Sequence, residues 1–325
     1  MLNNYFSSII AVNVDNYYTS LDNLKASAGT FTASPSLINL EALRSEFLIS
    51  YKHYQGIKML NFGPTEDAFY CSSANIYPCD TTEINTNIST GSYTLGAASN
   101  TDAIGFPAID FLINNGTDSK ILEDFTTDED ASNRLLYLTE IIEKLYSEFT
   151  PVKAAWGNYR VDFTSATGTD VGSSTGIMFN AYMKDVELLK NAKIGIPSGQ
   201  QTGGMLLPNY VEGVYGDLSL ELAIESCTKL QSLFNGGEGI GLDDYVRHVE
   251  GDNVQESLVD LVNNQFDLVI SKLASFTSPL STEITTNSTE VNQTYLEIKK
   301  LVTYLKSDVA SILGILITYS DSDGD

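Results

Sequence analysis

The sequence predicts an all-α protein made of two four-helix-bundle-like domains packed side by side. Apolar residues recur at steps of three and four through most of the chain, which is the spacing of one helix face. The periodic runs are separated by stretches rich in Gly, Pro, Ser and Asn, and no convincing run of alternating apolar and polar residues indicates a strand. The 325 residues suffice for about two domains of ordinary size.

The boundary between the domains is expected near residues 164–175. This stretch is rich in Gly, Ser and Thr and shows no helical period. We therefore predict an N-terminal helical domain over residues 1–165 and a C-terminal helical bundle domain over residues 166–325.

Helices of the N-terminal domain are marked by Pro, Gly or capping residues at their ends. The long segment 65–103 shows little periodicity beyond a short turn near residues 83–88, and a connection of this length is usually functional or packed as an ordered loop. The expected helices cover residues 4–28 up to Gly29, a run opened by Ser34-Pro35 and stopped by Gly63-Pro64, a run from Gly105, and a run opened by a Thr126–Glu129 capping box and reaching Pro151, with a kink if it continues.

The C-terminal domain repeats the helical pattern. Its loop 194–208 carries several Gly and Pro residues but no phosphate-binding fingerprint, so we expect these residues to form turns and not a phosphate site. The expected helices cover residues 178–189, 211–234, 254–273 and 291–316.

Asp110 is the candidate functional residue that organises the rest. Pro107 suits the first turn of a helix, and Ile109 and Ile113 form an apolar stripe beside the Asp110 carboxylate. A carboxylate close to apolar packing needs donors, a cation or a helix end, which makes it a functional candidate. The structural alternative is an Asp that accepts hydrogen bonds from a neighbouring helix end.

Several segments together resemble the imelysin-like family. Gly105-Phe106-Pro107-Ala108-Ile109-Asp110 resembles the family signature written G-x-H-x-x-E. The further similarities are Phe47 to Pro64 with its final Phe-Gly-Pro, Asn75 to Asp80, Lys193 to Pro197, Val211-Glu212 and the closing Asp-Gly-Asp.

The resemblance implies an exported protein, often a lipoprotein, linked to bacterial iron uptake, and a peptidase activity is also attached to the family. It implies that Asp110, Asp80 and Glu212 converge at the domain interface beside Gly105, Phe106 and Pro107. The resemblance leaves open a cation, such as iron or another divalent ion, or a polar ligand at this place; it establishes no cofactor, and Asp110 is the weak metal candidate.

The chain departs from the family signature where a metal ligand would be needed. Pro107 stands at the His position and Asp110 at the Glu position, while Tyr51 and Lys58 replace an Arg and a Glu of the first long helix. These departures favour a protein that is not an enzyme.

The net charge and the distribution of apolar residues argue against other classes of protein. Asp and Glu outnumber Lys and Arg by 42 to 18, giving a formal charge of −24, which excludes nucleic acid and disfavours anionic lipid surfaces. No transmembrane run is present, and the N-terminus lacks the basic region of a signal peptide. We expect a trimmed form of an exported precursor, with a lipid anchor on that precursor, located in the periplasm or at the outer membrane or cell surface.

The remaining reactive residue types offer little catalytic chemistry. His53 and His248 lie far apart, and neither His-Glu-x-x-His nor Gly-x-Ser-x-Gly occurs. Cys71 and Cys79 flank a short loop and are expected to lie close enough to pair in an oxidising compartment, while Cys227 fits a buried core position. The tail 321–325 has the carboxylate density of a calcium loop but no closing Glu, so we interpret it as a solvated tail.

The sequence therefore predicts an exported, non-enzymatic binding component of iron uptake, with a ligand or an outer-membrane or periplasmic partner at the domain interface. A metallopeptidase of the imelysin type and a cell-surface interaction protein with a vestigial cleft are the alternatives.

Overall fold

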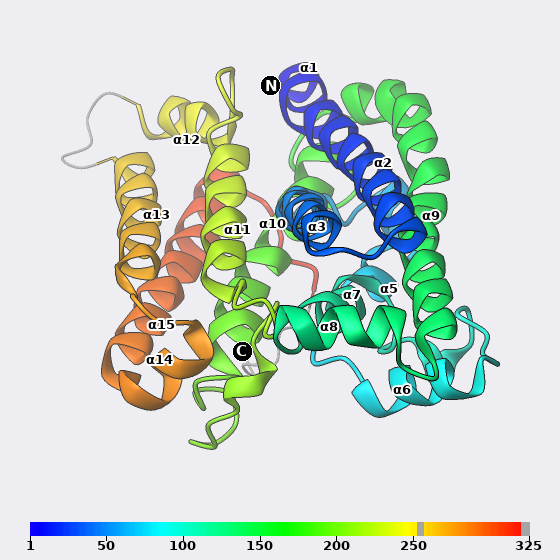
Figure 1. Ribbon diagram of the computed structural model, residues 1–325. Coiled ribbons are helices and arrows are strands. Elements are labelled where there is room, and N and C mark those ends of the chain that lie inside the picture. The colour runs from blue at the N-terminus through cyan, green and yellow to red at the C-terminus, as the bar shows by residue number, and fades with distance from the viewer. Residues whose placement is uncertain (252–256, 320–325) are drawn as a thin grey trace.

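The computed structural model describes residues 1–251 and 257–319, and within these ranges the regular elements are helices without a strand (Figure 1). The all-α prediction is confirmed. Within the same ranges, none of the helices combines the length and apolar character that crossing a bilayer requires. The expected tail at 321–325 and the start of the expected helix at Val254 lie outside the described residues.

The N-terminal part is organised around α2, which packs against both α3 and α9. Aromatic rings fill its centre, as where Tyr17 of α2 meets Phe149 of α9 edge-on at 4.7 Å between ring centroids. Its elements are α1 (Leu2–Asn4), the π-helical η1 (Tyr5–Ile10), α2 (Ala11–Ala33), α3 (Leu37–Lys58), α4 (Pro64–Asp67), α5 (Cys71–Ala74), α6 (Thr81–Thr90), the 3₁₀ turn η2 (Ala98–Asn100), α7 (Gly105–Asn114), α8 (Asp118–Thr126) and α9 (Ala131–Ser165).

The C-terminal part is built on α11, which packs against α13, and α13 in turn packs against α15. Helix α11 also packs against α3, so these two helices join the parts (Figure 1). The elements are α10 (Ser174–Leu188), the π-helical η3 (Leu189–Gly195), the 3₁₀ turn η4 (Pro208–Tyr210), α11 (Ser219–Phe234), α12 (Leu242–Glu250), α13 (Leu258–Ser275), α14 (Leu280–Thr286), α15 (Ser288–Thr303), the π-helical η5 (Tyr304–Val309) and α16 (Ala310–Leu313).

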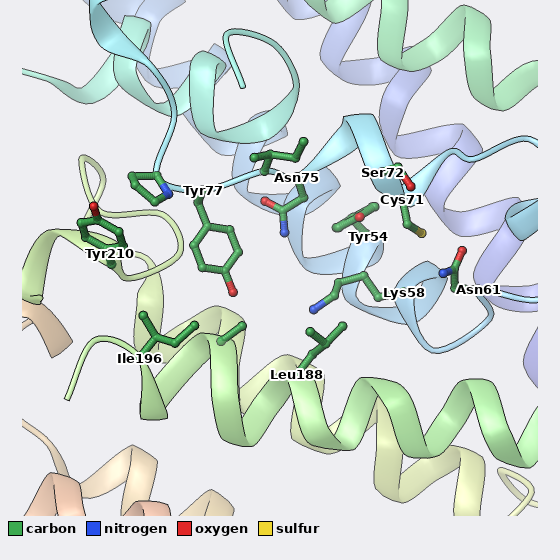
Figure 2. Close-up of a pocket in the computed structure, with 13 residues that line it drawn as sticks. Tyr54, Lys58, Asn61, Cys71, Ser72, Asn75, Tyr77, Leu188, Ile196 and Tyr210 are labelled. Carbon is green, nitrogen blue, oxygen red and sulfur yellow. The ribbon is translucent and has the colours of Figure 1, made fainter. Parts of the chain in front are cut away.

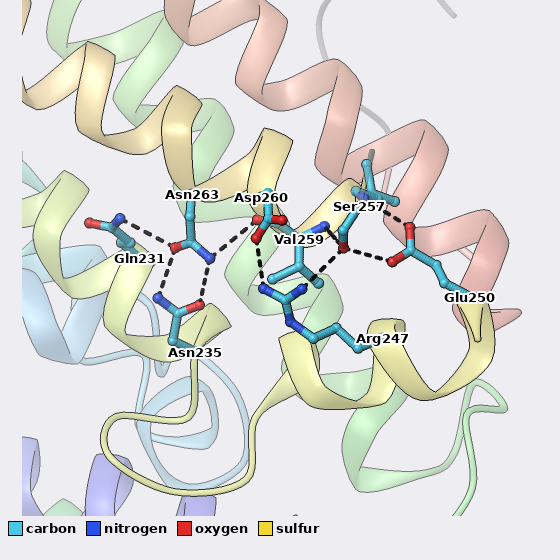
Figure 3. Close-up of polar contacts among 9 residues, drawn as sticks. Gln231, Asn235, Arg247, Glu250, Ser257, Val259, Asp260 and Asn263 are labelled. Carbon is cyan, nitrogen blue, oxygen red and sulfur yellow. Dashed lines mark hydrogen bonds and ion pairs between the residues drawn. The ribbon is translucent and has the colours of Figure 1, made fainter. Parts of the chain in front are cut away.

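Side-chain hydrogen bonds tie α11, α12 and α13 together at one end of this part (Figure 3). Asn235, which caps α11, and Asn263 of α13 exchange two amide hydrogen bonds of 2.8 and 3.0 Å. Arg247 of α12 forms an ion pair of 2.8 Å with Asp260. The Glu250 carboxylate accepts a hydrogen bond of 2.8 Å from the backbone amide of Leu258 and so satisfies a donor at the start of α13.

Two expected helix ends are displaced. The first helix does not close at Gly29 but continues to Ala33, because a glycine inside a helix weakens it without breaking it. The second begins at Leu37 with Ser36 as its N-cap, two residues after the expected Ser34-Pro35 opening.

The long segment 65–103 is ordered by the short elements α4, α5, α6 and η2. The turn expected near residues 83–88 is the middle of α6. The expected Thr126–Glu129 capping box is wrong: Thr126 ends α8, an element that the periodicity missed, and its hydroxyl donates to the Leu122 carbonyl. Helix α9 continues through Pro151 to Ser165.

The helix expected from residue 211 begins only at Ser219. Gly213 and Asp217 hold positive φ angles of 64° and 55°, which a right-handed helix cannot contain. The irregular segment 211–218 therefore precedes α11, and it carries Glu212. The short helices α12 and α14 were also missed.

The break between α9 and α10 falls inside the stretch 164–175 that the composition marked. The division into domains 1–165 and 166–325 stays a prediction.

Candidate functional site

A buried ion pair of the C-terminal part is hydrogen-bonded to residues of the N-terminal part. Lys193 lies in the π-helical segment η3 and Glu212 in segment 211–218, and their side chains are only 2% and 1% exposed. The Lys193 ammonium is paired with Oε2 of Glu212 and donates a hydrogen bond of 3.0 Å to Oε1 of Gln55. Short π-helical turns are often found at functional sites, and here one places a cation in the interior.

Both oxygens of Glu212 are occupied by donors of the protein. Its Oε1 accepts a hydrogen bond of 2.6 Å from the Asn75 amide and one of 3.3 Å from the Gln55 amide, while Oε2 faces Lys193. The Tyr51 hydroxyl donates to the other end of the Asn75 amide at 2.6 Å. The result is a continuous network from α3 to segment 211–218.

Burial and the neighbouring charges shift the pKa values of Lys193 and Glu212 in opposite directions. Burial lowers the pKa of Lys193 to about 8, even though attraction to Glu212 opposes the shift. Burial alone would raise the pKa of Glu212, but the charges of Lys193 and Lys58 outweigh it and hold that pKa below its usual value. Glu212 is therefore a fixed anion at neutral pH.

A second ion pair lies beside the first. The Lys58 ammonium at the end of α3 is 3.2 Å from an oxygen of Asp185 in α10, and the two side chains are 10% and 2% exposed. Burial opposes the charge of Lys58, yet Asp185 and Glu212 together raise its pKa. Lys58 is a cation at every physiological pH.

A pocket of about 510 Å³ opens next to these pairs, and segments of both parts line it. In Figure 2 the side chains of Lys58, Asn75 and Tyr77 point into the space above α10 and η3, which supply an apolar floor. The lining residues are Tyr54, Lys58, Asn61, Cys71, Ser72, Asn75, Ile76, Tyr77, Pro78, Leu188, Ala192, Ile196 and Tyr210. A volume of this size suits a small organic molecule.

Asp110 is buried next to the pocket region but does not line the pocket itself. Its oxygens accept hydrogen bonds of 2.9 Å from the Asn114 amide and 2.9 Å from the backbone amide of Tyr215. Burial raises its pKa to about 6, against the hydrogen bonds from Asn114, Tyr215 and Gly216. Asp110 thus holds segment 211–218, and through it Glu212, against α7.

The residues before Asp110 pack against α3 and α5, next to the ion-pair network. Gly105 has a φ of +75°, and a Cβ there would lie 2.3 Å from the Ala74 carbonyl oxygen. Phe106 stacks on Tyr51 with ring centroids 4.4 Å apart. Pro107 is buried in the first turn of α7. None of the three lines the pocket.

Asp80 does not join Asp110 and Glu212. It is exposed and caps α6, with hydrogen bonds of 2.8 and 3.0 Å from the amides of Thr82 and Glu83. The cap uses this carboxylate locally, and no hydrogen bond joins Asp80 to Asp110 or Glu212 within the described residues.

The cysteines are free thiols. Cys71 lines the pocket and Cys79 lies near Tyr215 and Asp110, and burial raises the pKa of each thiol to about 12. Cys71 and Cys79 are not bridged here, and their expected closeness for pairing in an oxidising compartment stays a prediction. Cys227 is fully buried, as expected.

Sequence reasoning missed most of the polar groups that make up the site: Gln55, Asn75, Tyr77, Asp185 and Lys193. Lys193 stood inside a recognised family segment, and Lys58 was noted only as a replacement. A usable signal was present on α3, since Tyr51, Gln55 and Lys58 follow each other at steps of four and three beside Tyr54.

This site does not fit a metal ion. Glu212 and Asp185 each face an ammonium group, Asp110 accepts amide hydrogen bonds, and Pro107 offers no donor atom. In residues 1–251 and 257–319 no group of three His, Cys, Asp or Glu side chains could hold a metal ion.

The all-helical fold is that of an imelysin-type protein. The sequence profile described as Peptidase_M75: Imelysin matches residues 11–307, and the chain belongs to this family.

Solved structures show the same fold. One, assigned as an iron-regulated protein A precursor from Parabacteroides distasonis, has a TM-score of 0.79 at 16% identity over 96% of this chain and 94% of that one. An imelysin-like protein from Psychrobacter arcticum has a TM-score of 0.77 at 17% identity over 98% of this chain and 96% of that one. No match to the chain was found among curated proteins.

Proposed function

We propose that this chain is an exported, non-enzymatic binding protein of the imelysin family that serves bacterial iron uptake. Its ligand site is the pocket between segments 54–78 and 188–210. The site acts in the periplasm or at the cell surface, between domains 1–165 and 166–325.

The observation that carries this proposal is the pocket with its two adjacent ion pairs. Segments from both parts of the chain line it, and charges from both parts are paired beside it. Buried charges are costly to place, and here two pairs of them lie beside one pocket. The link to iron is supported by the family and by the structural likeness to a protein assigned as iron-regulated.

The residues argue against the peptidase alternative. A metallopeptidase needs a metal with an open coordination position and a carboxylate free to act as a general base. Pro107 provides no ligand, and Glu212 is held by Lys193, Asn75 and Gln55. Among the described residues of the site, Asp185 faces the Lys58 ammonium and Asp110 accepts hydrogen bonds from Asn114 and Tyr215.

The test is complementation of a deletion strain of the source bacterium under iron limitation. The wild-type gene should restore growth, and Ala192→Trp, which fills the pocket from its floor, should not. Lys52→Met, an exposed change on α3 away from the pocket, is the matched control and should restore growth fully.

The proposal fails if Ala192→Trp, produced at wild-type levels, supports growth as well as the wild type. It also fails if the purified protein cleaves general protein substrates and loses that activity together with one bound zinc upon chelation.

A further inference from the structure

The ion pair at Lys58 is incomplete in a way that the fold does not explain. An ammonium has three N–H donors, yet among the described residues the charged partner of Lys58 is Asp185 alone. The two oxygens of Asp185 are buried and accept no hydrogen bond within the described residues. A buried charge without full hydrogen bonding is unfavourable.

The Lys58 ammonium is placed where a ligand can reach it. It lines the pocket, whereas Asp185 does not, so the carboxylate stands behind the ammonium as seen from the cavity. In Figure 2 the Lys58 nitrogen and the Tyr77 hydroxyl point toward the same space. Within the described ranges Lys58 is engaged by Asp185 alone, which leaves donors of its ammonium for a ligand, and no hydrogen bond from the Tyr77 hydroxyl to the protein is formed, so both groups can bind one acceptor.

The rest of the pocket is suited to an apolar body. Leu188, Ala192 and Ile196 follow each other at steps of four along α10, η3 and the residue after it, and they form a continuous floor. The Tyr210 ring closes one end. One cationic end and one apolar floor define an amphipathic ligand.

We propose that the pocket binds a small organic anion, with its carboxylate, sulfonate or phenolate group at Lys58 and Tyr77 and its apolar body on Leu188, Ala192 and Ile196. This assignment rests on the proposed function, in which the pocket is the ligand site. The chain carries a formal charge of −24, so its net charge repels such an anion and only a local cation can hold it.

The test compares two fluorescent probes with nearly the same aromatic body. 8-Anilinonaphthalene-1-sulfonate carries an anionic group, and N-phenyl-1-naphthylamine lacks it. We expect the folded protein to bind the sulfonate at one saturable site and about tenfold or more tightly than the neutral probe, since a hydrogen-bonded charge contributes at least this factor.

Variants of the ion pair give opposite results that unfolding cannot imitate. Asp185→Asn removes the competing anion behind Lys58 and should tighten sulfonate binding several-fold, with the neutral probe unchanged. The double variant Lys58→Met/Asp185→Asn removes both charges without leaving one unpaired, and it should abolish the preference for the sulfonate. Lys52→Met is the control and should bind both probes like the wild type.

Near-UV circular dichroism confirms that each variant is folded, because a loosened core also binds the sulfonate probe. The inference is overturned if the wild type binds neither probe, if it binds both equally, or if the double variant keeps the preference. In these cases a failure of Ala192→Trp to restore iron-limited growth would still support the pocket as the functional site, so the two proposals fail separately.

Discussion

Lys193 and Glu212 form an ion pair that is almost completely buried between the two parts of the chain. Gln55 and Asn75 complete it from the N-terminal part, and no charge of the pair reaches solvent. Its members therefore depend on each other, and removing one leaves the other as an isolated buried charge.

We expect Lys193→Met to lower the free energy of unfolding by about 3–5 kcal/mol, because Glu212 then remains buried without its paired cation. The double variant Lys193→Met/Glu212→Gln should recover much of this loss. Urea unfolding measures both. The control, Lys52→Met, breaks an exposed pair with Glu221 and should cost less than about 1 kcal/mol. A single variant as stable as the wild type would contradict the buried pair.

Asp110 should make stability depend on pH in a specific window. Its pKa is raised by burial to about 6 from an ordinary value of 3.8, so between about pH 4 and about pH 6 the folded state holds more protons than the unfolded state. The contribution of Asp110 is complete below the unfolded pKa and is lost as the pH rises through the folded pKa.

Asp110→Asn removes this titration. Hence the free energy of unfolding of the wild type minus that of the variant should fall from pH 4 to pH 7, by up to about 3 kcal/mol. Chemical denaturation at several pH values gives the difference. A difference that rises with pH or stays constant would contradict the raised pKa.

Gly105 and Gly29 should respond oppositely to alanine. At Gly105 the positive φ and the contact with the Ala74 carbonyl predict a loss of about 3 kcal/mol or more. At Gly29, inside α2, an added Cβ meets nothing within 4 Å, and Gly29→Ala should stabilise by about 0.5–1 kcal/mol. Melting temperatures of the two variants test both predictions. A Gly105→Ala variant as stable as the wild type would contradict the steric constraint at the start of α7.

Cys71 should react slowly despite lining the pocket. Burial raises its pKa to about 12, so at pH 8 only about one molecule in ten thousand carries the thiolate. Iodoacetamide should modify Cys71 at least about 100-fold more slowly than free cysteine, as followed by mass spectrometry. A rate near that of free cysteine would refute this environment. A Cys71–Cys79 bridge in protein from an oxidising compartment would confirm that the two thiols lie close enough to pair.

Sequence reasoning reached the helical class because long apolar stripes such as that of α3 reflect burial directly. It failed for α8, α12 and α14, because helices of two turns carry too few periodic residues to stand out. It also extended α11 back to residue 211, since apolar residues before Ser219 fit the period although Gly213 and Asp217 turn the backbone away.

The site was predictable only in part. Asp110 stood out as a carboxylate in an apolar run, and Glu212 came from the family resemblance. Asp185 and Lys193 could not be recognised, because each resembles an exposed charge on a helix until tertiary packing brings its partner from another part of the chain. Asp80 caps α6, and the sequence alone does not distinguish an Asp that caps a helix from one that binds a ligand.

The claim that the pocket holds a ligand is tested most directly by native mass spectrometry of protein purified from the iron-limited source bacterium. We expect wild-type protein to carry one small organic molecule that Ala192→Trp does not carry, while Lys52→Met carries it at the wild-type level. Wild-type and Ala192→Trp proteins with identical masses, after correction for the substitution, would contradict the assignment of this pocket as the ligand site.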